Sequence, residues 1–200
     1  MTSRGWFIVF EGIDGSGKST QIDLLSMKLR DKGIDYVLER EPSDSSIGKF
    51  IREYAEAGGR YLSPETEALL FTADRFEHSK RISDYLDEGI NVVCDRYFHS
   101  TLAYQGASGV DLGWLTEMQK FVLKPNLVLL LDVDPDSSLL RVSGRSLTVF
   151  EDRSFLRKVR EFYIRFAEEG EMVKIDTLKP IDDVEKEIEM RVEEIFKIKL

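Results

Sequence analysis

The sequence predicts an α/β fold with a mainly parallel five-stranded sheet and helices on both faces. Five short apolar segments alternate along the chain with longer segments whose apolar residues recur at helical spacing. Two of the short segments, residues 90–97 and 126–134, are nearly continuously apolar, which is typical of parallel strands covered on both faces. Since no linker, repeat or low-complexity tract divides the 200 residues, we expect residues 1–200 to form a single domain.

The first predicted strand leads into a glycine-rich loop. Residues 6–11 have the length and composition of a strand, and Ile22, Leu25 and Leu29 recur at helical spacing after the loop. The loop fits the pattern G-x-x-x-x-G-K-[ST], whose backbone N–H groups bind phosphates at the start of a helix. This P-loop predicts contacts to a nucleoside triphosphate from Gly12, Ile13, Asp14, Gly15, Ser16, Gly17, Lys18, Ser19 and Thr20. The alternative is a tight glycine turn with no ligand.

The other elements follow from apolar patterns and helix-capping residues. A long helix is predicted with Ser63 as N-cap, Pro64 at its first position and its end near Gly89. The remaining strands are predicted over residues 34–41, 90–97, 126–134 and 171–176. A C-terminal helix is predicted to pack on the domain through one stripe formed by Val184, Ile188, Val192 and Ile195.

Composition excludes several classes of protein. The net charge of −9 argues against binding to a nucleic acid polymer. No apolar run reaches the roughly 18 to 20 residues of a membrane span, and the N-terminal residues show no signal-peptide pattern, so we expect a cytoplasmic protein without a membrane partner. The single cysteine, Cys94, excludes an intramolecular disulfide and offers no zinc cluster, and its apolar surroundings predict a core residue.

Arginines decide between the two main classes of P-loop protein, a switch GTPase and a kinase. The guanine-reading segment Asn-Lys-x-Asp of the GTPases is absent, whereas arginines occur where an anionic phosphoryl acceptor needs them. Arg96 follows Asp95 at the carboxyl end of a predicted strand. The others lie on predicted helices or near a Gly- and Ser-containing stretch, and they are Arg52, Arg75, Arg141, Arg145 and Arg153. Each could also be an ordinary surface arginine.

Several motifs together resemble one family. The segments FEGIDGSGKST, Glu41-Pro42 followed by Ile51-Arg52, EALLFTADRFEH and DRYFHSTLAYQG occur in the order and spacing of the thymidylate kinases, and the resemblance runs along the whole chain. It implies a three-layer P-loop kinase fold with a lid at about residues 141–153. It also implies transfer of a phosphoryl group from ATP to dTMP with Mg²⁺, a step in dTTP synthesis, and a homodimer.

The resemblance also implies a role for each residue around the acceptor nucleotide. Phe71 would stack on thymine and Arg75, one helical turn later, would donate to a base carbonyl. Thr101 and Gln105 would face the edge of the base, and Tyr104 would crowd the 2′ position of the sugar. Ordinary core packing is the alternative for Phe71.

The remaining acceptor contacts concern the phosphate and the sugar. The resemblance implies that Arg52 and Arg96 hold the acceptor phosphate and that Glu41 belongs to the same site. Asp14 is an unexpected residue in an anion-binding loop, because a carboxylate repels phosphate; it would instead accept a hydrogen bond from the 3′-hydroxyl of the acceptor. The alternative is that Asp14 caps the backbone of the loop.

On the catalytic side, the resemblance implies roles for Lys18, Asp95, Arg96 and Arg145. Asp95 and Ser19 would hold Mg²⁺, although an indirect role for Asp95 remains the alternative. Gly15 stands where one subtype of the family carries a P-loop arginine, so this chain resembles the subtype with lid arginines, Arg141 against adenine and Arg145 toward the transferred phosphoryl group.

Two features leave the sequence reading open. Residues 41–46, EPSDSS, depart from the Glu-Pro-Gly-Gly-Thr of many bacterial relatives, and the lid is short for the bacterial type. These departures concern the phosphate pocket and the fit of the donor. Independently of them, the alternative functions are a kinase for another nucleoside monophosphate or for a deoxynucleoside, and a nucleotide-dependent switch without an acceptor.

Overall fold

The computed structural model describes residues 4–57, 62–141 and 152–200. Five strands form one sheet in the order β2-β3-β1-β4-β5, and every neighbouring pair is parallel. The strands are β1 (Phe7–Glu11), β2 (Tyr36–Arg40), β3 (Asn91–Asp95), β4 (Leu127–Asp132) and β5 (Val173–Asp176). In the central strand, Val9 pairs with Cys94 of β3 and with Val128 of β4. The predicted five-stranded parallel sheet is confirmed.

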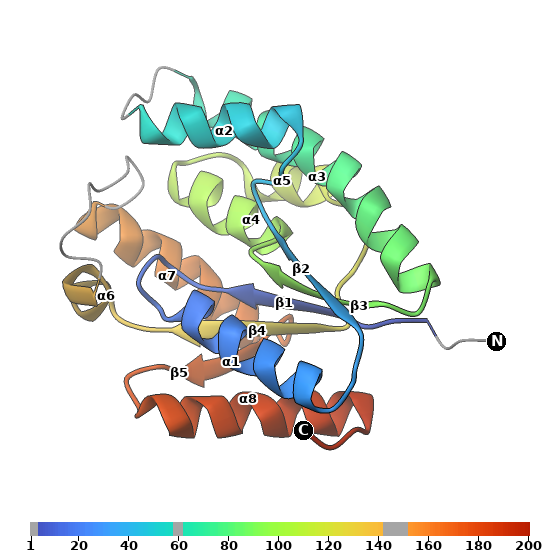
Figure 1. Cartoon of the computed structure of the whole chain (residues 1–200). Helices are drawn as coiled ribbons and strands as arrows, with labels where there is room; N and C mark the ends of the chain where they lie inside the picture. The colour runs from blue at the N-terminus through green and yellow to red at the C-terminus, as the bar shows by residue number, and fades with distance from the viewer. Residues whose placement is uncertain (1–3, 58–61, 142–151) are drawn as a thin grey trace.

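Helices cover both faces of the sheet and complete three layers (Figure 1). One face carries α1 (Lys18–Asp31) and α8 (Ile181–Phe196), which contact each other and the strands. The other face carries α3 (Pro64–Asp87), α4 (Phe98–Ala107) and α7 (Arg153–Glu168). The remaining helices pack on this second layer and are α2 (Ser46–Glu56) on α3, α5 (Leu112–Met118) on α4 and α6 (Pro135–Arg141) on α7.

Strand residues point alternately into two apolar cores, as the period of a strand requires. Phe7 and Val9 pack in the core under α3, α4 and α7, whereas Ile8 and Phe10 pack in the core under α1 and α8. The predicted stripe of α1 is confirmed, because Ile22, Leu25 and Leu29 are buried in the second core. Cys94 is fully buried in the first core as expected, and burial raises the pKa of its thiol well above the usual value.

The predicted start of the long helix is confirmed. Ser63 is the N-cap of α3, its hydroxyl accepts a hydrogen bond from the backbone N–H of Thr66, and Pro64 occupies the first turn. The second strand is shorter than predicted. The backbone N–H of Ile34 bonds the carbonyl of Leu29 at the end of α1, so this residue belongs to the turn before β2.

The prediction for the C-terminal helix was wrong at one residue. Val184, Ile188 and Val192 of α8 are buried, but Ile195 is 42% exposed. In the last turn it is Phe196 that packs inward, with its ring stacked on Trp6 at 4.5 Å between centroids. No helix among the described residues is long and apolar enough to span a membrane.

The topology places a site at one edge of the sheet. The chain runs from β1 outward to β2 and β3 on one side and then crosses to β4 and β5 on the other, so the order reverses around β1. Ligands of such sheets bind beyond the carboxyl ends of the strands at this switch point. The residues that leave β1, β2 and β3 there are Gly12, Glu41 and Arg96.

Candidate active site

The glycine-rich loop after β1 has the backbone geometry of an anion site. Gly12, Gly15 and Gly17 all have positive φ values, of 140°, 77° and 93°. At Gly12 a side chain is also excluded by space, since a Cβ there would lie 2.5 Å from the carbonyl oxygen of Leu131. Gly17 is the N-cap of α1 and has no side chain to occupy the N–H groups of the first turn. The loop therefore presents the N-terminus of α1 to an anion.

Lys18 begins α1 and is folded back over the loop. Its Nζ donates to the carbonyl oxygens of Gly12 at 3.0 Å and Ile13 at 3.2 Å. Burial, followed by the charge of Arg96, lowers the pKa of Lys18 from its usual value. An anionic ligand in the loop would favour the charged ammonium. Ser19 and Thr20 lie beside it and are exposed.

A cavity of about 400 Å³ opens next to this loop, between α2, α3 and α4. All nine residues predicted for the acceptor nucleotide line it, and they are Asp14, Glu41, Arg52, Phe71, Arg75, Arg96, Thr101, Tyr104 and Gln105. They come from six separate segments of the chain, so the fold brings together residues that only motif resemblance had grouped. The role of each at a bound ligand stays a prediction.

Arg75 is held rigidly at one end of the cavity. Only 1% exposed, it donates from Nε to Glu41 Oε2 at 2.8 Å, from Nη1 to Gln119 Oε1 at 3.0 Å and from Nη2 to Thr101 Oγ1 at 3.0 Å. Phe71 and Gln105 lie in the same lining. This end thus combines an aromatic ring with a fixed planar donor, which suits a nucleobase.

Arg96 lies at the boundary between the cavity and the loop. Its Nη2 donates to Asp14 Oδ1 at 2.6 Å, its Nη1 donates to Ser100 Oγ at 3.2 Å, and its guanidinium lies 5.3 Å from the centre of the Tyr104 ring. The φ of Arg96 is 68°, a left-handed conformation that costs roughly 1–2 kcal/mol for a residue with a Cβ. Strain of this kind concentrates at functional sites.

The predicted partner of Arg96, Arg52, reaches the cavity from α2. Its Nη1 donates to the carbonyl oxygens of Pro42 and Ser43 and its Nη2 pairs with Asp44 at 3.0 Å.

Sequence reasoning missed the residue that fixes the loop of residues 41–46. Asp74 of α3 is 1% exposed and accepts from the N–H and hydroxyl of Ser43, at 2.7 and 2.6 Å, and from the hydroxyl of Ser45. The serines of EPSDSS therefore anchor the loop to α3.

Sequence reasoning also missed Glu11, which fixes the start of α4. Glu11, the last residue of β1, is fully buried and accepts from the N–H of Tyr97 at 2.8 Å, the hydroxyl of Ser100 at 2.7 Å and the hydroxyl of Tyr163 at 2.8 Å. It thereby fixes the start of α4 next to Arg96. A carboxylate at the end of an otherwise apolar strand, directly before Gly12, was the available signal.

Asp95, the last residue of β3, has a buried carboxylate oxygen. Among the described residues, its buried Oδ1 has no hydrogen-bond partner, which is costly unless a ligand satisfies it. The exposed hydroxyl of Ser19 is the other oxygen predicted at this place. Carboxylate and hydroxyl oxygens are ligands that fit Mg²⁺.

The arginines of the predicted lid are only partly described. Arg141 ends α6, and its Nη2 donates to the carbonyl of Thr177 at 2.8 Å and its Nη1 to that of Gly15 at 3.4 Å. Arg141 therefore lies against the P-loop. Arg153 begins α7 and pairs with Asp136 at 2.6 Å. Arg145 and the rest of residues 142–151 lie outside the described residues.

Comparison with known proteins gives a consistent result. A family model described as thymidylate kinase matches residues 10–188. A protein named "Probable thymidylate kinase" from Pyrococcus horikoshii is 48% identical over 193 residues, covering 92% of this chain and 94% of the relative. A "Probable thymidylate kinase" from Methanocaldococcus jannaschii is 45% identical over 183 residues, 91% and 93% of the two chains. A "Thymidylate kinase" from Thermomicrobium roseum is 47% identical over 167 residues, 79% of each chain.

Proposed function

Since this chain belongs to the thymidylate kinase family and phosphorylates dTMP, we propose that the cavity between α2, α3 and α4 holds dTMP while the P-loop holds ATP. The observation that supports this division is that all nine predicted acceptor residues line one cavity, which opens beside the phosphate-binding loop. Asp14 and Arg96, the pair at the boundary, then lie between the two nucleotides.

The base binds at the end of the cavity held by Arg75. Arginine has five N–H donors. The bonds of Arg75 within the described part of the chain engage Nε, both hydrogens of Nη2 and one of the two on Nη1. We infer that the second Nη1 hydrogen donates to the 4-carbonyl of thymine, while Phe71 stacks on the ring.

The sugar and phosphate extend toward the loop. Tyr104 lies beside Arg96 and disfavours a 2′-hydroxyl by occupying its space. Burial raises the pKa of Tyr104, so the side chain stays a neutral phenol. Arg52 and Arg96 bind the acceptor phosphate, for which a planar guanidinium is well suited because it donates two parallel hydrogen bonds.

Phosphoryl transfer then depends on position and charge rather than on covalent catalysis. Lys18 leaves the loop carbonyls to contact the phosphates of ATP, and Arg96 neutralises charge on the acceptor side. Asp95 and Ser19 would hold Mg²⁺, which would supply positive charge to the transferred phosphoryl group. Arg141 contacts the adenine side and Arg145 the transferred group, as the family resemblance implies.

The role of Asp14 can be tested with a cycle of one substitution in the protein and one in the substrate. Wild-type enzyme should lose about 10- to 100-fold in kcat/KM when dTMP is replaced by 3′-deoxy-dTMP, because one charge-assisted hydrogen bond is lost. Asp14→Ala should lower kcat/KM for both substrates, since Arg96 loses its partner, but should barely distinguish them.

The control is Glu56→Ala, which removes another carboxylate from the cavity lining and should discriminate as the wild type does. If Asp14→Ala still loses as much as the wild type on deletion of the hydroxyl, Asp14 does not contact the 3′ position. Asp14 would then act only through the loop and Arg96.

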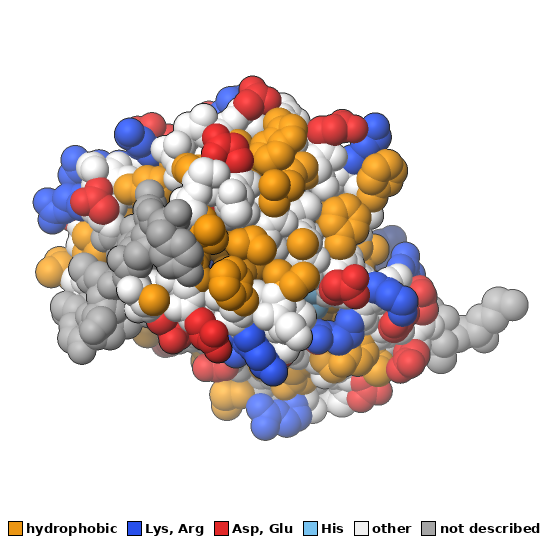
Figure 2. Space-filling model, turned by 90° about the horizontal axis from the view of Figure 1, so that it is seen from above, with side chains coloured by type: hydrophobic (Ala, Val, Ile, Leu, Met, Phe, Trp, Pro, Cys, Tyr) orange, Lys and Arg blue, Asp and Glu red, His pale blue; other side chains and the backbone are white. Residues whose placement is uncertain are grey.

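By the same family resemblance we propose a homodimer acting in the cytoplasm. Leu69 and Phe76 lie seven residues apart on α3, close to two full turns, and are 51% and 42% exposed. Hydrophobic side chains gather on the face seen from above in Figure 2, where α3 lies. A second copy of the chain would cover this face.

A further inference from the structure

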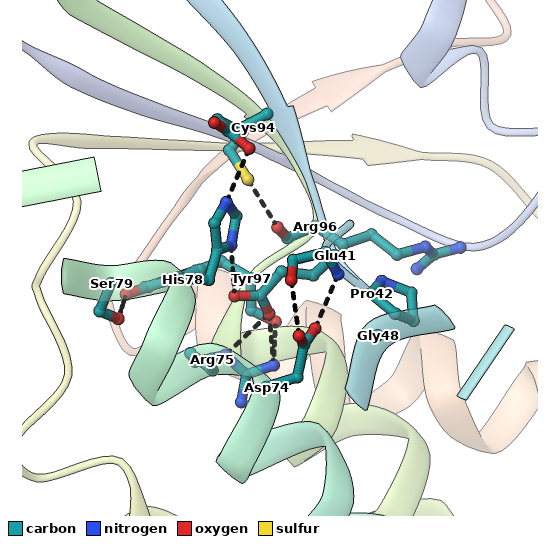
Figure 3. Close-up of polar contacts among 12 residues, drawn as sticks. Glu41, Pro42, Gly48, Asp74, Arg75, His78, Ser79, Cys94, Arg96 and Tyr97 are labelled. Atoms are coloured by element: carbon teal, nitrogen blue, oxygen red, sulfur yellow. Dashed lines mark hydrogen bonds and ion pairs between the residues drawn. The ribbon is translucent and has the colours of Figure 1, made fainter. Parts of the chain in front are cut away.

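A row of ionisable side chains leads to Arg75 in the cavity lining, and Figure 3 shows three of its members, His78, Glu41 and Arg75. Arg81 donates to Glu39 Oε2 at 2.7 Å, and His78 Nε2 lies 3.0 Å from the same oxygen. His78 Nδ1 lies 3.1 Å from Glu41 Oε1, and the other oxygen of Glu41 accepts from Arg75. The imidazole therefore connects β2 to the arginine that lines the cavity.

The geometry around His78 favours the protonated imidazole. Each of its ring nitrogens faces a carboxylate oxygen, and a carboxylate can only accept. A neutral imidazole would donate from one nitrogen and turn the lone pair of the other toward an anion about 3 Å away. The His78 side chain is fully buried and that of Glu41 is 4% exposed, so water is poorly placed to relieve this contact. The imidazolium, with two N–H donors, fits both carboxylates.

The other titratable groups nearby support this state. Burial lowers the pKa of His78, but the hydrogen bonds and charges of Glu39 and Glu41 outweigh it and raise the pKa above its usual value. From β3 and the residues after it come Cys94 and Tyr97, and burial raises the pKa of each, so both are neutral. Beyond the row itself, Asp44 and Tyr85 interact with Arg81 in the described part of the chain.

We propose that His78 is a positioning residue for the acceptor base, which as an imidazolium fixes the carboxylate of Glu41 and through it the guanidinium of Arg75. The proposal rests on the proposed function, because it assumes that Arg75 contacts the base of dTMP. His78 itself does not line the cavity within the described part of the chain. Its loss should therefore affect binding of the acceptor more than the transfer step.

The pH dependence has a definite sign. The pKa of His78 is raised in the folded protein. His78 is therefore fully protonated at pH values below the usual histidine pKa, and it loses its proton as the pH rises through the raised pKa. We expect the KM for dTMP to be constant around neutral pH and to increase on the alkaline side, with kcat changing less.

The kinetic test uses His78→Gln. A glutamine can donate to one carboxylate but turns its carbonyl oxygen toward the other, so Glu41 and Arg75 lose their fixed geometry. We expect the KM for dTMP to rise about tenfold, the loss of roughly one hydrogen bond to a charged group, with kcat within about twofold. The alkaline increase in KM should disappear in this variant.

The matched control is His99→Gln. His99 is the only other histidine of the chain, its side chain is 3% exposed and its Nε2 pairs with Glu171 at 3.1 Å. It lies on α4 and shows no contact with Glu41 or Arg75 in the described part of the chain, so KM and its pH profile should stay those of the wild type.

A spectroscopic test of the wild type does not depend on whether His78→Gln folds. With two histidines, long-range ¹H–¹⁵N correlation spectra of the wild type and His99→Gln assign His78 directly. At neutral pH we expect both nitrogens of His78 to carry protons in the wild type. In Glu39→Gln the amide can donate to Nε2, so His78 should become neutral with its proton on Nδ1, and the pH dependence of KM should disappear.

The outcomes separate this inference from the proposed function. A wild-type spectrum with one protonated nitrogen at neutral pH, or an unchanged KM for dTMP in His78→Gln, would overturn the role of His78 while leaving the enzyme a dTMP kinase. Failure of the wild type to use dTMP would instead overturn the proposed function.

Discussion

Replacing Arg96 with alanine should lower kcat/KM for dTMP by about 100- to 1,000-fold, the usual cost of removing a fixed donor from a reacting charge. Arg96 is the residue that contacts the P-loop, through Asp14, and the cavity at the same time. Its backbone has a strained left-handed conformation, and its side chain lies between the P-loop and the cavity. Steady-state kinetics with saturating ATP measure the loss.

Two further variants show whether the loss of kcat/KM is specific to the guanidinium of Arg96. Arg96→Lys keeps the charge but not the planar fork, and should recover only part of the activity. Arg165→Ala removes an exposed arginine that pairs with Glu169 on α7, and should leave kcat/KM unchanged. An Arg96→Ala enzyme with at least a tenth of the wild-type kcat/KM would contradict the assignment of Arg96 to the phosphate.

The second large effect is expected for Lys18→Ala. The Nζ of Lys18 is buried and donates to two carbonyl oxygens of the P-loop. On binding a phosphate, the ammonium group would exchange these carbonyls for phosphate oxygens. Because its charge acts mainly as the phosphoryl group moves, kcat should fall about 100- to 1,000-fold while the KM for dTMP changes little.

Lys28→Ala is the matched control for this variant, since Lys28 lies on the same helix but pairs on the surface with Glu185 and Glu189 of α8. Its kcat should equal that of the wild type. If Lys18→Ala raised the KM for dTMP with kcat preserved, Lys18 would serve the acceptor rather than the transferred group.

The sequence was a good guide to local elements because their signals are local. The cap of α3 at Ser63 and the apolar strands are properties of a few neighbouring residues, and the structure confirms them. The order of the strands was beyond reach, since it depends on crossover connections between distant segments. At the end of α8, periodicity alone favoured Ile195, whereas the position of Trp6 on another element decides that Phe196 packs inward.

The site shows the same division. Motif resemblance placed nine residues around an acceptor, and all nine line one cavity. It did not reveal Glu11, Asp74 or His78. Within the described part of the chain these residues do not line the cavity, but they hydrogen-bond Ser100, Ser43 and Glu41, which do or which lie next to residues that do. Their partners are up to 152 residues away, as for Glu11 and Tyr163, and a single buried carboxylate or imidazole in a sequence does not indicate what it bonds.

The structure explains the serines in residues 41–46, EPSDSS, which replace the glycines expected from many bacterial relatives. Ser43 and Ser45 bond the carboxylate of Asp74, and a Cβ at Gly48 would lie 2.0 Å from the carbonyl of Ser43, so α2 lies directly against this loop. Side-chain hydroxyls of Ser43 and Ser45 thus fix this loop to α3. The carbonyls of Pro42 and Ser43 in turn hold Arg52.

The most direct test of dTMP binding in the cavity is ADP release, measured by a coupled assay, with dTMP, dUMP and dCMP as acceptors. ADP formation should require a monophosphate, with dTMP modestly preferred over dUMP. Against dCMP the preference should be about 10- to 100-fold, because the amino group of cytosine leaves the buried donor of Arg75 unpaired. Equal kcat/KM for dTMP and dCMP, or ADP released at the same rate without any monophosphate, would contradict the assignment of this cavity to dTMP.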